Sequence, residues 1–247
     1  MNTVDKDNMF KSIWNFPENI IDALKISEEI KIKNDYNNVN KVIIAGMGGS
    51  AIGGDVVNSL IKEDIKIPFI VNRGYDIPPW VDSSTLIICS SYSGNTEETL
   101  SVLEKAKSSN SIVIGITTGG ELEKLCEKYG YDKIIIPSGL QPRAALAFSF
   151  IPLLLIMKKT GIIENDIEPW LHSASKLIKL KRIEYSVNVD RNPVWALANK
   201  IYDKLPIIYA DSDGLDTVAV RLKGQICENS KILAYHNIYP EMNHNEI

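Results

Sequence analysis

The sequence predicts an α/β protein with parallel sheets, arranged as two domains of which the second is incomplete. Three observations lead to this prediction. Short β-branched runs alternate with helical patterns over residues 41–136, two of these runs end in turns rich in glycine and serine, and the alternation resumes after residue 192. Strands that alternate with helices form βαβ units, whose parallel sheets are covered on both faces.

The first domain is expected over residues 1–160. It opens with a helical region over 7–33 that is broken near Pro17, because proline is tolerated in the first turn of a helix but not in its interior. The alternating part follows, and it ends in a long apolar helix. Strands are expected at 41–45, 67–71, 85–89, 111–116 and 133–136, and helices at 50–62, 95–109, 121–129 and 143–160.

A helical connection over 161–191, with its helix at 166–186, leads to the second domain over 192–247. Two parallel strands cannot form a stable covered sheet alone. Either they add to a neighbouring sheet or the natural protein continues past Ile247, and we favour the second alternative. In this domain we expect helices at 194–204 and 215–227 and strands at 205–210 and 231–235.

Composition excludes several classes of function. The net charge is −4, which argues against a nucleic-acid partner. The three cysteines form no paired motif, which fits a reducing compartment. The most apolar stretch, 144–157, is too short to span a bilayer, and the polar N-terminus is unlike a signal peptide. We therefore expect a cytoplasmic protein with neither nucleic-acid nor membrane partners.

Two turns carry the strongest functional signal. The first begins at Gly46 and the second at Ser90, and each follows an apolar run and leads into a helical pattern. Glycines let backbone N–H groups turn toward a ligand, hydroxyls add donors, and a helix N-terminus contributes roughly half a positive charge. Two such turns in one sheet can converge on one small phosphorylated molecule.

The first turn also permits a different interpretation. Residues 46–51 satisfy the dinucleotide fingerprint G-x-G-x-x-A, which expects an acidic residue at the end of the second strand. That strand ends instead at Asn72 and Arg73, although Arg73 could face a 2′-phosphate. A nicotinamide-dependent oxidoreductase is therefore an alternative, but the second turn, rich in hydroxyls, favours a sugar phosphate.

Taken together, the motifs resemble the bifunctional phosphoglucose/phosphomannose isomerases, a family built from SIS (sugar isomerase) domains. Many SIS proteins share the two turns, and three further motifs narrow the resemblance. These are Pro142-Arg143-Ala144-Ala145, Glu228-Asn229-Ser230-Lys231 and Asn243-His244-Asn245-Glu246. The resemblance covers the chain from about Val42 onward, and it implies two flavodoxin-like SIS domains, usually in a homodimer.

The resemblance also implies a role for each motif. Arg143 would lie over the reacting carbons, Glu228 would act as the base, and His244 would open the sugar ring from the partner subunit. Members of the family continue past the Asn-His-Asn-Glu motif and supply a lysine, and a threonine or glutamine linked to the use of mannose 6-phosphate. The substrate phosphate would be held by Gly48, Gly49, Ser50, Ser91, Ser93 and Thr96.

The expected reaction interconverts glucose 6-phosphate and fructose 6-phosphate, with mannose 6-phosphate as a further candidate substrate. The base moves a proton between C1 and C2 through a cis-enediol, so neither a metal nor an organic cofactor is needed. Glu228 follows an amphipathic helix, where partial burial would favour its action as a base. The acidic turn at 211–216 is expected to be a bend before a helix rather than a cation site. The alternative function is a SIS-type sensor that binds a sugar phosphate without catalysis.

Overall fold

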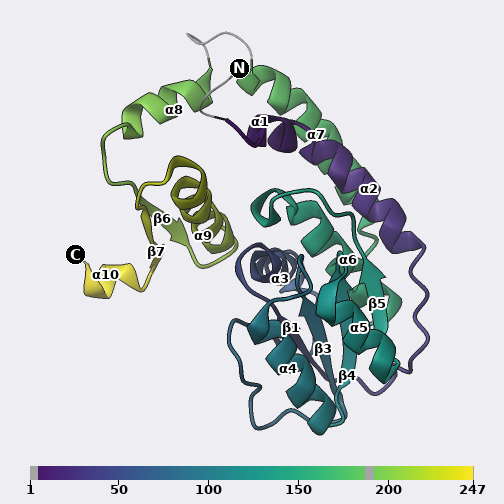
Figure 1. Ribbon diagram of the computed structural model, residues 1–247. Coiled ribbons are helices and arrows are strands. Elements are labelled where there is room, and N and C mark those ends of the chain that lie inside the picture. Colours follow the sequence, from purple (N-terminus) through teal and green to yellow (C-terminus); the bar gives the residue numbers. More distant parts are fainter. Residues whose placement is uncertain (1–4, 187–191, 247) are drawn as a thin grey trace. The chain divides into compact units, whose positions relative to one another are not determined.

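The computed structural model describes residues 5–186 and 192–246 and divides the chain into two compact units, Met1–Ser175 and Lys176–Ile247 (Figure 1). The end of the expected helical connection, 187–191, and Ile247 lie outside the described residues.

A parallel sheet of five strands forms the centre of the first unit, which confirms the predicted fold class. The order across the sheet is β2-β1-β3-β4-β5, so the chain moves from β1 to one edge and then builds the other edge from β3. This is the flavodoxin-like order. The strands are β1 (Lys41–Ala45), β2 (Phe69–Asn72), β3 (Thr85–Ser90), β4 (Ile112–Thr117) and β5 (Asp132–Ile135).

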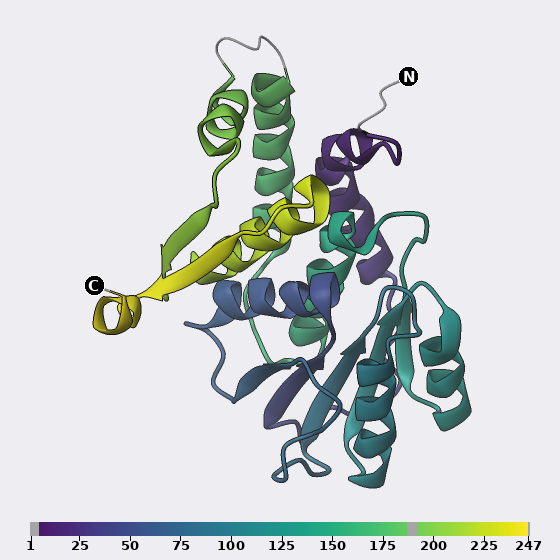
Figure 2. The ribbon, with the colours of Figure 1, turned by 60° about the vertical axis from the view of Figure 1, so that its left-hand side comes forward.

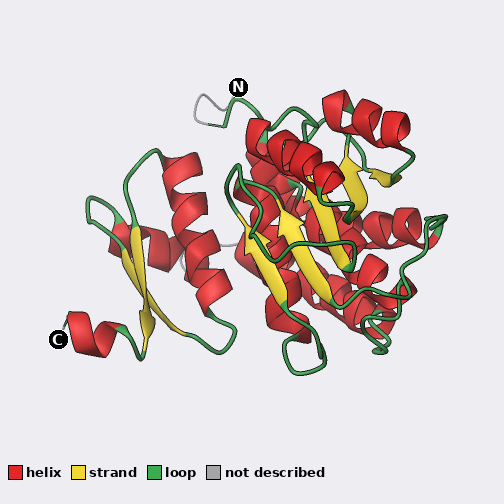
Figure 3. Cartoon of the chain, turned by 90° about the horizontal axis from the view of Figure 1, so that it is seen from below, coloured by secondary structure: helices red, strands yellow, loops and turns green. Residues whose placement is uncertain are grey.

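Helices cover both faces of the sheet. Parallel strands are joined by right-handed crossovers, and β1 to β2 runs across the sheet in the direction opposite to β3 to β4, so their helices lie on opposite faces. Accordingly α4 (Glu97–Ser108) and α5 (Gly120–Tyr129) pack on one face, while α3 (Gly48–Ile61) contacts β1 and β2 and packs against α6 (Leu146–Lys159). Figure 3 shows the strands side by side with helices around them.

The apolar helix α6 lies in the core, as its composition predicts. Its residues 146–157 are all buried, and α2 (Phe16–Glu28) packs on it together with α3. A helix that is apolar all round must be buried, because no face of it suits water. No helix among the described residues is long and apolar enough to cross a membrane.

The N-terminal helical region is interrupted where the sequence predicts. α1 (Met9–Trp14) ends at Asn15, and Pro17 occupies the first turn of α2, the position where a proline without an N–H costs least. The helix ends at Glu28 rather than at residue 33, and the following segment is irregular up to β1.

The second unit contains two parallel strands, β6 (Ile207–Asp211) and β7 (Tyr235–Tyr239), joined by α9 (Asp216–Gln225). A π-helical turn at Ile226–Ser230 extends α9, and Lys231, with φ of 57°, ends it. The expected strand at 231–235 is therefore wrong, because helical structure continues through Ser230 and the strand starts only at Tyr235. The other helices are α7 (Glu168–Ser186), which begins in the first unit, α8 (Pro193–Ile201) and α10 (Met242–Asn245).

A buried carboxylate fixes the irregular segment before β1. Asp132, at the start of β5, accepts hydrogen bonds from the Tyr36 hydroxyl at 2.6 Å and from the backbone amides of Lys33 and Asn34 at 3.1 and 3.0 Å. Burial raises the pKa of Asp132, but these hydrogen bonds outweigh burial and leave its pKa below the usual value. Burial and the contact with Asp132 raise the pKa of Tyr36 above its usual range.

Replacing Asp132 tests this anchor. We expect Asp132→Asn to lower the free energy of unfolding by about 2 kcal/mol at neutral pH, because buried donors lose a charged acceptor. A carboxyl with a depressed folded-state pKa stabilises the fold above its unfolded pKa, and that contribution is lost as the pH falls through the folded pKa. The difference between variant and wild type should therefore shrink below about pH 4 in urea titrations.

Asp76→Asn is the matched control. The Asp76 side chain is 86% exposed and forms an ion pair with Lys105, so its loss should cost less than about 1 kcal/mol. Equal stability of the two variants at neutral pH would contradict the anchoring role of Asp132.

Candidate functional site

The two predicted turns lie side by side at the carboxyl end of the sheet. β1 and β3 are neighbours in register, with Ala45 opposite Cys89, so the turns that follow leave the sheet at the same level. The Cα of Gly46 packs on the end of β3, where a Cβ would lie 3.0 Å from the carbonyl oxygen of Ser90. This is also the point where the strand order reverses, and ligands of open α/β sheets bind there.

Hydroxyl groups gather in the turn after β3. The Oγ of Ser91 and the Oγ1 of Thr96 are 2.8 Å apart, and Ser91 also accepts a hydrogen bond from the amide of Gly94 at 3.1 Å. Thr96 precedes the first residue of α4, but its side chain makes no capping hydrogen bond to that helix. Two hydroxyls therefore sit beside a helix N-terminus, an arrangement that suits an anion. Ser93 is exposed, and its Oγ accepts from the amide of Asn95 at 3.2 Å.

Gly94 locks this turn onto the next one. Its φ is 72°, and a Cβ would lie only 1.8 Å from the carbonyl oxygen of Gly119, so no larger residue fits. Its own carbonyl accepts from the amide of Leu122 at 2.9 Å. The turn after β3 is thus held in place by the turn between β4 and α5.

The turn after β1 is held from its other side by α6. The Oγ of Ser149 lies 3.3 Å from the carbonyl oxygens of both Gly49 and Ser50, and a Cβ on Gly53 would collide with Ser149. Gly48, with φ of 48°, is exposed and has open space around it. Sequence reasoning missed Ser149, although a lone serine in an apolar helix was a usable signal.

Arg143 reaches the same region through its backbone. It lies in a 3₁₀ turn, Pro142–Ala144, rather than at the start of the predicted helix, because α6 begins only at Leu146. A Cβ on Gly49 would be 2.8 Å from the carbonyl oxygen of Pro142 and 3.8 Å from the amide nitrogen of Arg143. The first unit therefore brings together the two turns and the segment of Arg143.

Glu228 and His244 belong to the second unit. Glu228 lies in the π-helical turn and is exposed, so the expected partial burial is not found. Burial lowers the pKa of Arg221, and the negative charge of Glu228 acts in the opposite direction. His244 lies in α10, which is also exposed apart from Met242.

Within this unit Glu228 and His244 occupy opposite ends. Helix α9 runs back from the carboxyl end of β6, so Glu228 lies near the start of β7, whereas α10 follows the end of β7. Figure 2 shows the end of this helix and the C-terminus at the two ends of the strand. A strand of five residues spans roughly 16 Å, so Glu228 and His244 are widely separated within one chain.

Local contacts bear on two other interpretations of the sequence, the role of Arg73 and the nature of the acidic turn at 211–216. The guanidinium of Arg73 forms an ion pair with Asp55 of α3, so it is engaged within the protein rather than held ready for a 2′-phosphate. In the acidic turn, the carboxylate of Asp211 accepts from the amide of Asp213 at 2.8 Å, as in a bend, and α9 begins at Asp216.

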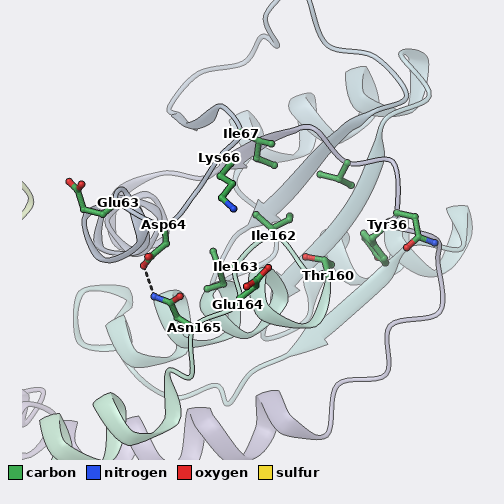
Figure 4. A pocket seen from close by; sticks show the side chains of 13 residues that line it. Tyr36, Glu63, Asp64, Lys66, Ile67, Thr160, Ile162, Ile163, Glu164 and Asn165 are labelled. Carbon is green, nitrogen blue, oxygen red and sulfur yellow. Dashed lines mark hydrogen bonds between the residues drawn. The ribbon is translucent and has the colours of Figure 1, made fainter.

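A pocket of about 430 Å³ lies at the amino end of the strands of the first sheet, opposite the two turns (Figure 4). Its wall includes Val39 before β1 and Ile67 before β2, and Asn165 donates a hydrogen bond to Asp64. No candidate site residue lines it. It is therefore separate from the site built on the two turns.

Comparisons with known proteins agree with the motifs. Residues 35–135 match the model of the SIS domain, and residues 190–247 match that of the bacterial phospho-glucose isomerase C-terminal SIS domain. A bifunctional phosphoglucose/phosphomannose isomerase of Caldicellulosiruptor bescii is 48% identical over 97% of this chain and 71% of its own length. A D-glucosamine-6-phosphate 4-epimerase of Sulfolobus acidocaldarius is 31% identical over 93% of this chain and 71% of its own length.

Solved structures support the fold. The C-terminal domain of glucosamine-fructose-6-phosphate aminotransferase from Francisella tularensis superposes with a TM-score of 0.72 over 96% of this chain and 71% of that one. The sequence identity is 18%, so the likeness concerns the fold alone.

Removing the gathered hydroxyls tests the anion site. We expect Ser91→Ala and Thr96→Val each to raise the dissociation constant for inorganic phosphate about tenfold, the effect of one hydrogen bond to a charged group. Calorimetric titration measures it. Ser109→Ala is the control, because Ser109 forms hydrogen bonds with Ala106 and Ser111 just before β4, at the amino end of the strands. Unchanged phosphate affinity in both test variants would rule out the site.

Proposed function

The chain belongs to the bifunctional phosphoglucose/phosphomannose isomerase family of sugar-phosphate isomerases, and we propose that it interconverts glucose 6-phosphate and fructose 6-phosphate. The observation that carries this proposal is the pairing of a turn rich in glycine with a turn rich in hydroxyls at the reversal point of the sheet, with the Arg143 segment packed on the first of them. Mannose 6-phosphate is the further substrate that the names of the relatives suggest.

In this proposal the first unit holds the phosphate. Gly48, Gly49 and Ser50 offer backbone amides and a hydroxyl from the turn after β1, and Ser91, Ser93 and Thr96 offer hydroxyls from the turn after β3. The ester oxygen at C6 fixes one end of the substrate, so that C1 and C2 at the other end are positioned for reaction. Binding of a non-reacting group in this way lowers the barrier by orientation.

Glu228 then carries the proton. Its carboxylate removes the proton from C2 of the open-chain aldose, and the electrons of that C–H bond form a double bond between C1 and C2. The oxygen on C1 takes the negative charge and then the proton of the C2 hydroxyl, by way of the cis-enediol. The same carboxyl group returns a proton to C1, which yields the ketose and restores the carboxylate. The positive charge of Arg143 stabilises the oxygen on which negative charge develops. Every step uses side chains of the protein, so the proposal requires no metal or organic cofactor.

His244 completes the site as the group that opens the sugar ring. The wide separation of Glu228 and His244 within the second unit supports a site that takes these residues from two chains. We therefore propose a homodimer with two-fold symmetry, in which Glu228 of one chain works with His244 of the other. A sensor without catalysis would share the phosphate site but would not interconvert sugars.

Glu228→Gln tests the base. In the full-length gene product, the variant should keep its affinity for sugar phosphates and lose at least about a hundredfold in kcat, because only proton transfer is removed. A coupled assay of fructose 6-phosphate formation measures the rate. Glu184→Gln is the control, since Glu184 pairs with Lys181 on the surface of α7. Turnover of Glu228→Gln close to that of wild type would show that another group moves the proton.

Mixed dimers test the shared site. Glu228→Gln and His244→Ala subunits, each inactive alone, should regain activity after subunit exchange, because each mixed dimer contains one site with both native residues. Full exchange of equal amounts should restore about a quarter of wild-type activity, since half of the dimers are mixed and each has one intact site. If verified mixed dimers stay inactive, His244 acts within its own chain or has no role in the reaction.

A further inference from the structure

Tyr92 connects the turn after β3 to the segment that carries Arg143. Its hydroxyl donates a hydrogen bond to the carbonyl oxygen of Pro137 at 2.9 Å and accepts one from the amide of Leu140 at 3.0 Å. Both partners lie in residues 136–141, the irregular connection between β5 and the 3₁₀ turn of Arg143. One side-chain oxygen therefore holds this connection at two points.

The backbone of Tyr92 is itself firmly placed. Its carbonyl oxygen accepts from the amide of Thr118 at 3.1 Å and from the Thr118 hydroxyl at 2.8 Å. The preceding residue, Ser91, donates its amide to the carbonyl of Ile116 at 3.0 Å. Tyr92 is thus anchored to β4 and the turn after it, while its ring reaches toward the connection.

The far end of the connection rests on the other turn. Pro142 and Arg143 pack against Gly49, where even a methyl group would lie 2.8 Å from the carbonyl oxygen of Pro142. Ile136, at the start, donates its amide to the carbonyl of Thr117 at 2.9 Å. Between these ends the chain passes through Gly139, with φ of 96°, and the Tyr92 hydroxyl bonds on both sides of it.

We propose that Tyr92 is a positioning residue, which sets the place of Arg143 relative to the phosphate-binding turns by holding the connection 136–141. The inference rests on the role proposed for Arg143 and extends it to a residue that makes no contact with the reacting carbons. Ser91 and Ser93, on either side of Tyr92, are assigned to the phosphate. In this proposal the short segment 91–93 holds the phosphate of the substrate through its serines and, through Tyr92, also positions Arg143 at the reacting end.

The chemistry of the hydroxyl suits this role. Burial raises the pKa of Tyr92, with the hydrogen bond from Leu140 acting in the other direction, so the hydroxyl keeps its proton at neutral pH. A neutral phenol can donate and accept at once, which is what Pro137 and Leu140 require. Phenylalanine would keep the ring and its packing and remove both bonds.

The test is a double-mutant cycle in the full-length gene product. Tyr92→Phe should lower kcat about tenfold, because displacement of a charge-stabilising group by a fraction of an ångström is costly in rate. KM and the affinity for inorganic phosphate should stay within about twofold of wild type. Arg143→Ala should lower kcat by at least about a hundredfold. In the Arg143→Ala background, Tyr92→Phe should change kcat by less than about twofold.

Two further measurements separate positioning from general damage. Hydrogen exchange at the amide of Leu140 should accelerate in Tyr92→Phe, since that amide loses its acceptor. Tyr129→Phe is the matched control, because it removes a tyrosine hydroxyl bonded to Glu104 elsewhere on the unit, and its kcat should equal that of wild type.

The outcomes are distinct. Normal turnover of Tyr92→Phe, or a tenfold loss that persists without Arg143, overturns the positioning role. If this happens while Glu228→Gln is inactive, the proposed function stands and only the inference falls. If Glu228→Gln is fully active, the failure lies in the proposed function. Normal turnover of Arg143→Ala also overturns the inference, since the group to be positioned would then be dispensable.

Discussion

The close approach of the turn after β1 to the end of β3 is the contact on which the first unit depends. Gly46 brings backbone against the Ser90 carbonyl, and a side chain at this position would push the two turns apart. Both turns are then fixed from outside, by Ser149 of α6 on one side and by the turn between β4 and α5 on the other. The groups that we propose to bind the phosphate are therefore placed by packed helices and strands rather than by a free loop, and this would preorganise them for an anion.

Much of this arrangement follows from the sequence because it is local. The strands of the first sheet are nearly continuous apolar runs, and the turns after β1 and β3 are recognisable from glycine and serine between a strand and a helix. The predicted start of the last strand, β7, was wrong for a local reason as well. The helical pattern of α9 continues into a π-helical turn that a 3.6-residue period does not describe. Lys231 ends this turn in the left-handed conformation, which lysine rarely adopts and which its sequence therefore does not indicate.

The contacts that organise the site could not be predicted in this way. Tyr92 and Leu140 are 48 residues apart, and Ser149 and Gly49 are 100 residues apart. Nothing in either neighbourhood indicates the partner, since the pairing arises only when the connection after β5 returns across the sheet. Arg143 was predicted from a resemblance, whereas its place beside Gly49 depends on how α6 packs on α3. The exposure of Glu228 likewise depends on tertiary structure that its helical pattern does not reveal.

The π-helical turn at Ile226–Ser230 has a consequence for how Glu228 can vary. A π turn is a helical turn that has taken in one surplus residue. Deleting one residue between α9 and Glu228 would restore the regular winding. Residues after the turn would keep their angle around the helix axis, whereas Glu228, inside the turn, would be rotated to a different angle. The carboxylate would then face another direction with its chemistry unchanged. With Glu228 as the proposed base, the number of residues in this turn is thus as restrictive as the identity of its glutamate.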